Sequence, residues 1–189
     1  MLHLVRHGRP LIVPGTPAAG WDLDPAAYDD VWALRSSGRL PARAAWFTSP
    51  EPKAIGTAQL LTDAEVGVLP DLREHERTGE WIDDFAGAVR RAFVAPDAPA
   101  VPGWEPLSAC RERVVPVVRR VLEVHGDEDV VLVGHGTAWT VVMADLTGEP
   151  PDLDRWAALA MPDVITVEVT GRFRPVRDGD RAVPPRPRW

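Results

Sequence analysis

The chain has little cysteine and no long apolar segment. Cys110 is the single cysteine in 189 residues, so no disulfide can form within the chain, as expected in a reducing cytoplasm. The longest apolar runs are too short to span a bilayer, and the N-terminus lacks the features of a signal peptide. We therefore expect a cytoplasmic protein in which Cys110 is a buried apolar residue.

The chain also lacks an excess of positive charge. It has 28 acidic residues against 21 lysines and arginines, which gives a formal net charge of −7. Such a surface repels nucleic acid and anionic membranes, so neither is expected as a partner. An anionic ligand must therefore bind in a locally basic pocket, and a small molecule is the expected partner.

Several catalytic motifs are absent. In "HERTG", Gly79 stands where a zinc-binding HExxH motif needs its second histidine. In "GHGTA", Gly136 stands where a GxSxG motif needs its serine. The chain contains no Walker A or GxGxxG loop, and His75 and His125 have no evident liganding partners. We expect neither a metal nor another cofactor.

The spacing of apolar residues predicts strands that alternate with helices. The expected strands are 2–6, 43–49, 65–70 and 129–134, followed by a hairpin over 163–176. The expected helices are 24–38, 49–61, 80–94, 106–126 with a kink near Pro116, and one that begins at Gly136. This alternation predicts an α/β fold, a three-layer α/β/α sandwich with a mostly parallel central sheet.

The length of the chain is most simply that of one domain over residues 1–189. Residues 95–103 form a proline-rich break, and the proline- and arginine-rich tail 178–189 is expected to be poorly ordered.

Two of the predicted strands, in "LHLVRHG" and "VVLVGHG", end in a His-Gly pair. Because ligands bind at the carboxyl ends of parallel strands, we expect His7 and His135 at the same edge of the sheet. Gly136 opens a helix, whose N-terminal N–H groups favour an anion, and Gly8 and Gly136 let a ligand approach the backbone. Arg6 adds a cation that can hold two oxygens.

This combination of groups suits a phosphoryl group. An imidazole can attack phosphorus and form a phosphohistidine, while the other donors hold the equatorial oxygens of the transition state. A lone histidine at the end of a strand is usually only a polar residue at the rim of the sheet. Two histidines in the same context favour a functional role.

Four segments resemble motifs of the histidine phosphatase (phosphoglycerate mutase-like) superfamily, and they follow one another along the chain in the family's order and spacing. "LVRHG" resembles the opening motif, which implies that His7 is the phosphorylated nucleophile and Arg6 a phosphate clamp. "VVLVGHGTAWTVVMADLTG" resembles the second motif, which implies that His135 and Gly136 line the phosphate pocket. The resemblance implies a phosphoglycerate mutase-like fold.

The other two segments carry the remaining site residues. "FTSPEPKAIGTAQLL" resembles a segment in which the family has a second clamp arginine, and here Lys53 takes that place. "LREHERTGEW" resembles the segment with the proton donor, which is Glu74 here. One extra residue precedes Gly79, so Glu76 is an alternative donor. Without the resemblance, the residues around Lys53 predict only a solvated lysine on a helix.

Two further features bear on the substrate. "RPLIVPG" replaces the threonine and asparagine contacts that usually follow "RHG", which favours a phosphatase over a mutase. Residues 82–106 are expected to form either a short cap over the site or a plain surface loop. Thr137 is expected either to cap the helix that begins at Gly136 or to contact phosphate, and capping is favoured.

The sequence predicts a metal-independent phosphomonoester hydrolase that acts on a small phosphorylated substrate through phospho-His7. A phosphoglycerate-type phosphomutase and a catalytically weak phospho-ligand binding protein are the alternatives. The mutase needs a pocket for a second anionic group, which Arg90 and Arg91 do not evidently supply.

Overall fold

The computed structural model describes residues 1–78, 82–169 and 173–176. Their strands form one six-stranded sheet in the order β3–β2–β4–β1–β5–β6. The strands are β1 (Leu2–Arg6), β2 (Ala45–Thr48), β3 (Val66–Val68), β4 (Val130–Gly134), β5 (Asp163–Val169) and β6 (Phe173–Pro175). The first four strands are parallel, while β5 runs antiparallel to β1 and β6 antiparallel to β5. The expected α/β fold with a mostly parallel sheet is confirmed.

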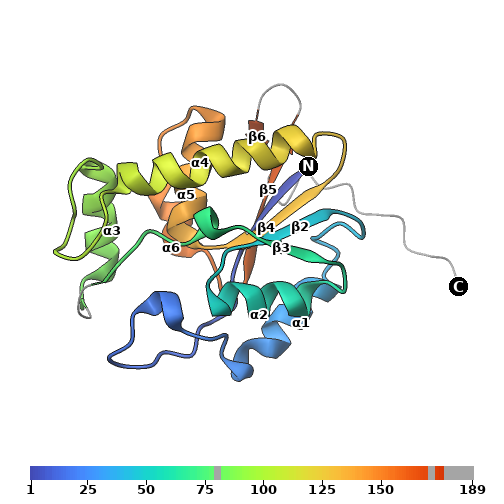
Figure 1. Cartoon of the computed structure of the whole chain (residues 1–189), viewed down its shortest axis with the longest axis horizontal. Helices are drawn as coiled ribbons and strands as arrows, with labels where there is room; N and C mark the ends of the chain where they lie inside the picture. The colour runs from blue at the N-terminus through green and yellow to red at the C-terminus, as the bar shows by residue number, and fades with distance from the viewer. Residues whose placement is uncertain (79–81, 170–172, 177–189) are drawn as a thin grey trace, which may run out of the picture.

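Helices cover both faces of the sheet and complete the three layers (Figure 1). They are α1 (Tyr28–Ser36), α2 (Pro52–Leu61), α3 (Phe85–Val94), α4 (Leu107–Val124), α5 (Gly136–Thr147) and α6 (Leu153–Ala158). α4 and α5 lie on one face, and α1 and α2 lie on the other. α3 stands away from the sheet, at the left of Figure 1.

The side chains of β4 show why this strand reads as a continuous apolar run. Val130 and Leu132 belong to the core beneath α4 and α5, whereas Val131 and Val133 belong to the core beneath α1 and α2. Successive side chains of a strand point to opposite faces, so a strand covered on both sides needs apolar residues at every position.

Two helices begin later than expected. α2 begins at Pro52 rather than at residue 49, because Pro52 occupies the first helical position, where proline is favoured. α3 begins at Phe85 rather than at residue 80, because the Asp84 carboxylate accepts a hydrogen bond from Gly87 N, at 2.9 Å, and caps the helix there.

Other differences concern short or marginal features. The expectation of a helix from Asp24 holds in part, because a 3₁₀ turn at Pro25–Ala27 comes before α1. α4 continues past Pro116 as one helix. The six-residue helix α6 has no sequence prediction, because it is too short to show a helical period. The tail 178–189 and part of the expected hairpin, 170–172, lie outside the described residues.

Cys110 is buried in the core beneath α4, as expected. Of the helices in residues 1–78, 82–169 and 173–176, none combines the length and apolar content needed to cross a membrane.

The parallel strands β1, β2 and β4 end side by side. His7 N donates a hydrogen bond to Gly134 O at 2.9 Å, and Ser49 N donates one to Val133 O, also at 2.9 Å. These bonds continue the ladder one residue beyond the strands, so the residues that follow β1, β2 and β4 share one edge. The expectation that His7 and His135 meet at this edge is confirmed.

Gly134 leaves room for an indole beside this edge. A Cβ atom at Gly134 would lie 2.5 Å from Trp139 Cζ2, and Trp139 Nε1 donates a hydrogen bond to Val5 O at 2.8 Å.

We predict that Gly134→Ala lowers the free energy of unfolding by about 1–3 kcal/mol, because the tryptophan must shift in a packed core. Gly20→Ala is the matched control, since no atom lies within 4 Å of its added Cβ. Equal urea midpoints for the two variants would contradict this account.

Candidate active site

His7 is held as a neutral imidazole with one nitrogen available. Its Nδ1 lies 2.6 Å from Gly8 O, and a carbonyl oxygen only accepts, so Nδ1 carries the proton and Nε2 keeps its lone pair. Burial lowers the pKa of His7 to about 3, and the cations of Lys53 and Arg6 act in the same direction. The ring is therefore uncharged near neutral pH, as nucleophilic attack requires.

His135 follows β4 and lies beside His7. The centroids of the two rings are 5.1 Å apart, and His135 Nε2 lies 2.7 Å from Ser49 Oγ and 3.4 Å from Glu51 Oε1. Burial lowers the pKa of His135 well below its ordinary value, and the neighbouring His7 adds to this effect. The site thus contains two neutral imidazoles at the N-terminus of α5.

The carboxylate of Glu74 occupies the N-terminal turn of α5. Its Oε1 accepts a hydrogen bond from Ala138 N at 2.9 Å, and its Oε2 accepts one from Thr137 N at 3.3 Å. Glu74 therefore caps the helix from another segment, and the expectation that Thr137 provides the cap is wrong. The Thr137 hydroxyl instead accepts a hydrogen bond from Arg77 Nη2 at 2.9 Å.

The electrostatic surroundings of Glu74 favour its ionised form. Burial by itself raises the pKa of Glu74, but the Arg77 guanidinium and the N–H groups of His75 and Ala138 outweigh that effect. The pKa of Glu74 consequently lies below its ordinary value. A negative charge at a helix N-terminus is also favoured by the helix dipole.

The structure separates Glu74 from the alternative donor, Glu76. The Glu76 side chain is 46% exposed and forms an ion pair with Arg73, whereas that of Glu74 is 18% exposed. Arg113 fixes the backbone of this segment, because its guanidinium donates to Arg73 O at 2.9 Å and to Glu74 O at 3.2 Å. Glu74, and not Glu76, thus lies among the site residues.

Arg6 and Gly136 lie against each other at the start of α5. Arg6 Nη1 donates a hydrogen bond to Leu159 O at 2.5 Å, which fixes the guanidinium beside α6. A Cβ atom at Gly136 would lie 3.4 Å from Arg6 Nε, so glycine here lets the arginine approach the helix closely. Gly8 also lets Leu23 pack against the backbone, because a Cβ atom at Gly8 would lie 2.7 Å from Leu23 Cδ1.

Lys53 is buried, and its interpretation as a solvated helix residue is wrong. Its ammonium group forms an ion pair with Glu51 and donates to Ala18 O at 2.7 Å. Burial raises the pKa of Glu51, against the opposing effect of Lys53. Glu51 also accepts a hydrogen bond from Glu74 N at 2.8 Å. One buried carboxylate thereby connects Lys53, His135 and the Glu74 segment.

Three residues of this arrangement, Ser49, Glu51 and Arg77, were not identified from the sequence. Ser49 and Glu51 fall within the Ser-Pro segment, but no spacing rule indicates that they contact His135. Arg77 follows Glu74 by three residues, and this charge pairing was the only available signal. All three depend on contacts between segments that are distant in the sequence.

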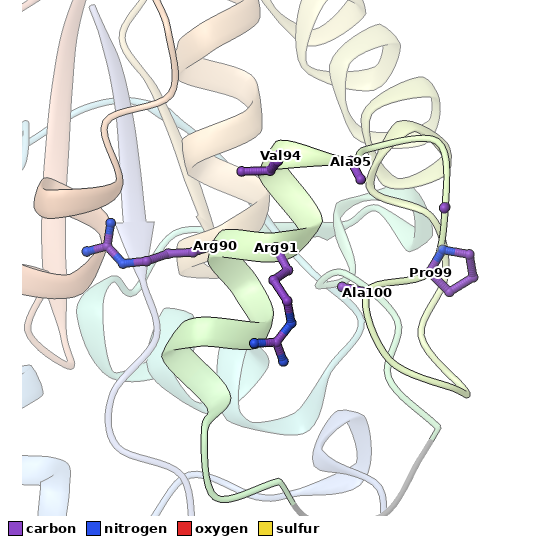
Figure 2. A pocket seen from close by; sticks show the side chains of 7 residues that line it. Arg90, Arg91, Val94, Ala95, Pro99 and Ala100 are labelled. Carbon is purple, nitrogen blue, oxygen red and sulfur yellow. The ribbon is translucent and has the colours of Figure 1, made fainter.

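Residues 82–106 include α3, and two side chains of this segment, Phe85 and Trp104, contact Arg77. Trp104 and Trp156 form a small core with Val89, which fixes α3 against α6. A hollow of about 420 Å³ lies between α3 and the turn that follows it, with Arg90 and Arg91 among its lining residues (Figure 2). Its lining contains neither histidine of the site, so this hollow is separate from the site around His7.

The sequence model of the histidine phosphatase superfamily (branch 1) matches residues 2–177. No curated protein matches the chain in sequence. The similar solved structures include YhfR of Bacillus stearothermophilus, with 22% identity, coverage of 96% of this chain and 97% of that one, and a TM-score of 0.73. The mycobacterial glucosyl-3-phosphoglycerate phosphatase has 22% identity, coverage of 92% and 95%, and a TM-score of 0.70.

A third similar structure is a mutant phosphoserine phosphatase from Entamoeba histolytica in complex with phosphoserine. It has 16% identity, coverage of 93% of this chain and 94% of that one, and a TM-score of 0.69. At such identities these likenesses show a shared fold, which is the phosphoglycerate mutase-like fold expected from the sequence.

The Lys53–Glu51 pair leads to a prediction about stability. We expect Lys53→Met to lower the free energy of unfolding at neutral pH by about 3–5 kcal/mol, because it leaves a buried carboxylate unpaired. The unpaired Glu51 then has a higher pKa folded than unfolded, so the loss diminishes as the pH falls through the folded-state value. Urea denaturation across pH measures both effects.

The matched control is the double variant Lys53→Met with Glu51→Gln. It removes the buried charge altogether, so its stability should recover toward that of the wild type and show little dependence on pH in the same range. A single variant as stable as the wild type at neutral pH would show that the ion pair does not contribute to the fold.

Proposed function

Because the chain belongs to the histidine phosphatase superfamily, branch 1, we propose that it is a phosphomonoester hydrolase acting through a phosphohistidine on His7. The observation that carries the proposal is the state of His7: a buried, neutral ring whose Nδ1 proton is held by Gly8 O. The substrate is a small phosphorylated molecule, consistent with the phosphatases among the similar structures.

In the first half of the proposed reaction, His7 Nε2 attacks phosphorus and forms a P–N bond. The P–O bond to the leaving group breaks, and the departing oxygen takes the proton of Glu74. This step needs the protonated form of Glu74, which the lowered pKa confines to acidic pH. Arg6, Lys53 and the start of α5 at Gly136 provide positive potential for the charge on the phosphoryl oxygens. His135, at 5.1 Å between ring centroids, is proposed to donate to a phosphoryl oxygen.

In the second half, water attacks the phosphohistidine. The carboxylate of Glu74 accepts a proton from that water, the P–N bond breaks, and the electron pair returns to His7 Nε2. Phosphate leaves, and both residues regain their initial states. The scheme needs no metal, because cationic side chains provide the charge that a metal would otherwise supply.

The contacts bear differently on the two alternative functions. A mutase needs a second anion pocket, but Arg90 is paired with Asp154 and Arg91 with Asp84, each at 3.1 Å. A catalytically weak phospho-ligand binding protein is favoured by Lys53, whose ammonium is paired with Glu51. Turnover of nitrophenyl phosphate separates the enzyme from the binding protein, and dependence on a bisphosphoglycerate primer separates the mutase from the phosphatase.

The nucleophile can be tested by trapping the intermediate. We predict that the wild-type enzyme, quenched during turnover, carries a phosphoryl group that is labile in acid and stable in base. His7→Ala should lose both this species and at least about 10³-fold of the turnover rate, since it removes the nucleophile. Wild-type turnover should be the same with and without a chelator. A fully active His7→Ala variant would rule out the mechanism, and loss of wild-type activity in chelator would indicate a metal.

The proton donor can be tested by changing the leaving group. An alkoxide needs a proton as it departs, whereas a nitrophenolate does not. We predict that Glu74→Gln lowers kcat for an alkyl phosphate by about 10²–10⁴-fold and has a much smaller effect on nitrophenyl phosphate. Glu76→Gln is the matched control and should change neither rate. The opposite result for the two variants would assign the donor to Glu76.

The pKa of Glu74 predicts the pH dependence of the same comparison. Because this pKa lies below its ordinary value, Glu74 loses its proton in the acidic range. The ratio of alkyl to nitrophenyl hydrolysis, measured as kcat/KM for the wild type, should fall as the pH rises through that range. Each kcat/KM is expressed per dianion of its substrate, because the two phosphates have different pKa values. The ratio then cancels the ionisation of the free enzyme, and in Glu74→Gln it should not depend on pH.

A further inference from the structure

Arg77 brings a second guanidinium to the first turn of α5. Its Nη2 donates to Thr137 Oγ1 at 2.9 Å and lies 3.9 Å from Glu74 Oε2. Arg6 lies at the neighbouring position of the same turn, because its Nε would be 3.4 Å from a Cβ atom at Gly136. The two arginines thus flank the start of the helix that follows His135.

Aromatic side chains from the 82–106 segment hold Arg77 in place. The guanidinium carbon lies 4.7 Å from the centroid of the Phe85 ring and 4.9 Å from that of the Trp104 ring. The two rings lie against each other, with centroids 5.9 Å apart, and both contact the guanidinium through cation–π interactions, which use none of its N–H donors. Arg77 Nε is buried and has no hydrogen-bond partner among the described residues, so the group keeps donors for a ligand.

Among the described residues, the site around the two histidines has one cation more than it has carboxylates to match. Lys53 is paired with Glu51, and Asp163, which acts on the pKa of Arg6, is itself paired with Arg39. Arg6 and Arg77 therefore share one carboxylate, that of Glu74, and the charge of Arg77 also acts on the pKa of His135. A net positive charge beside two neutral imidazoles favours a dianion.

We infer that Arg77 is a ligand of the phosphoryl group and provides the forked guanidinium that position 53 lacks. Lysine at position 53 supplies only a point charge, which is already paired with Glu51. Arg77 contacts the first turn of α5 through Thr137 and comes from the segment that also carries Glu74. The relevance of this assignment to catalysis rests on the proposed phosphatase function, but the binding itself can be measured without turnover.

The experiment measures inorganic phosphate binding to the full-length protein by calorimetry, with orthovanadate as a second probe. Arg77→Met keeps a side chain between Phe85 and Trp104 but removes the charge, and should weaken phosphate binding by about 10- to 100-fold. Arg77→Lys keeps the charge without the fork and should lie between Arg77→Met and the wild type. Arg91→Met is the matched control, because it removes an arginine of α3 that is paired with Asp84. This variant should bind phosphate like the wild type.

The results separate this inference from the proposed function. If Arg77→Met and Arg77→Lys both bind phosphate as tightly as Arg91→Met, Arg77 is not a phosphate ligand, whatever the wild type hydrolyses. If Arg77→Met does not fold, as judged by its thermal transition, Arg77→Lys decides the question alone. A wild type that binds phosphate through Arg77 yet hydrolyses no phosphomonoester would contradict the proposed function and leave the inference standing.

Discussion

The parallel pairing of β1 with β4 is the constraint on which the site depends. Leu2 to Arg6 pair in register with Val130 to Gly134, and the bond from His7 N to Gly134 O extends that ladder by one residue. Because the two strands run in the same direction and end at the same level, the next residues, His7 and His135, must lie side by side. A shift of register by one residue would turn one ring toward the opposite face.

Burial gives these residues their chemical character. The two imidazoles are neutral because charging them would cost desolvation free energy and bring positive charges together. The two carboxylates differ in this respect. The N–H groups of α5 and Arg77 outweigh the effect of burial on Glu74, whereas burial still raises the pKa of Glu51 beside Lys53. The site therefore consists of two neutral imidazole rings surrounded by charged side chains that are paired with one another, and this arrangement suits the binding of an anion.

Residues 82–106 contact this charge arrangement through Arg77. Phe85 and Trp104 contact Arg77, and Arg77 contacts both Glu74 and the start of α5. Movement of α3 relative to α6 would therefore change the position of a cation next to the proposed proton donor. In the proposed reaction, residues 82–106 thus act on Glu74 and the leaving group through Arg77, whereas the two histidines come from the ends of the strands.

The sequence by itself determined the α/β fold and the meeting of His7 and His135, because both follow from periodicity and from the direction of parallel strands. It also pointed to Arg6, Glu74 and Gly136 through motif resemblance. Only the tertiary structure decided that Glu74 rather than Glu76 lies in the site, that Lys53 is buried against Glu51, and that Arg77 faces α5. Apart from the Lys53–Glu51 pair, whose two residues are neighbours in the chain but are buried by other segments, these are contacts between segments far apart in the chain. Their formation depends on burial and partner geometry, which no local pattern encodes.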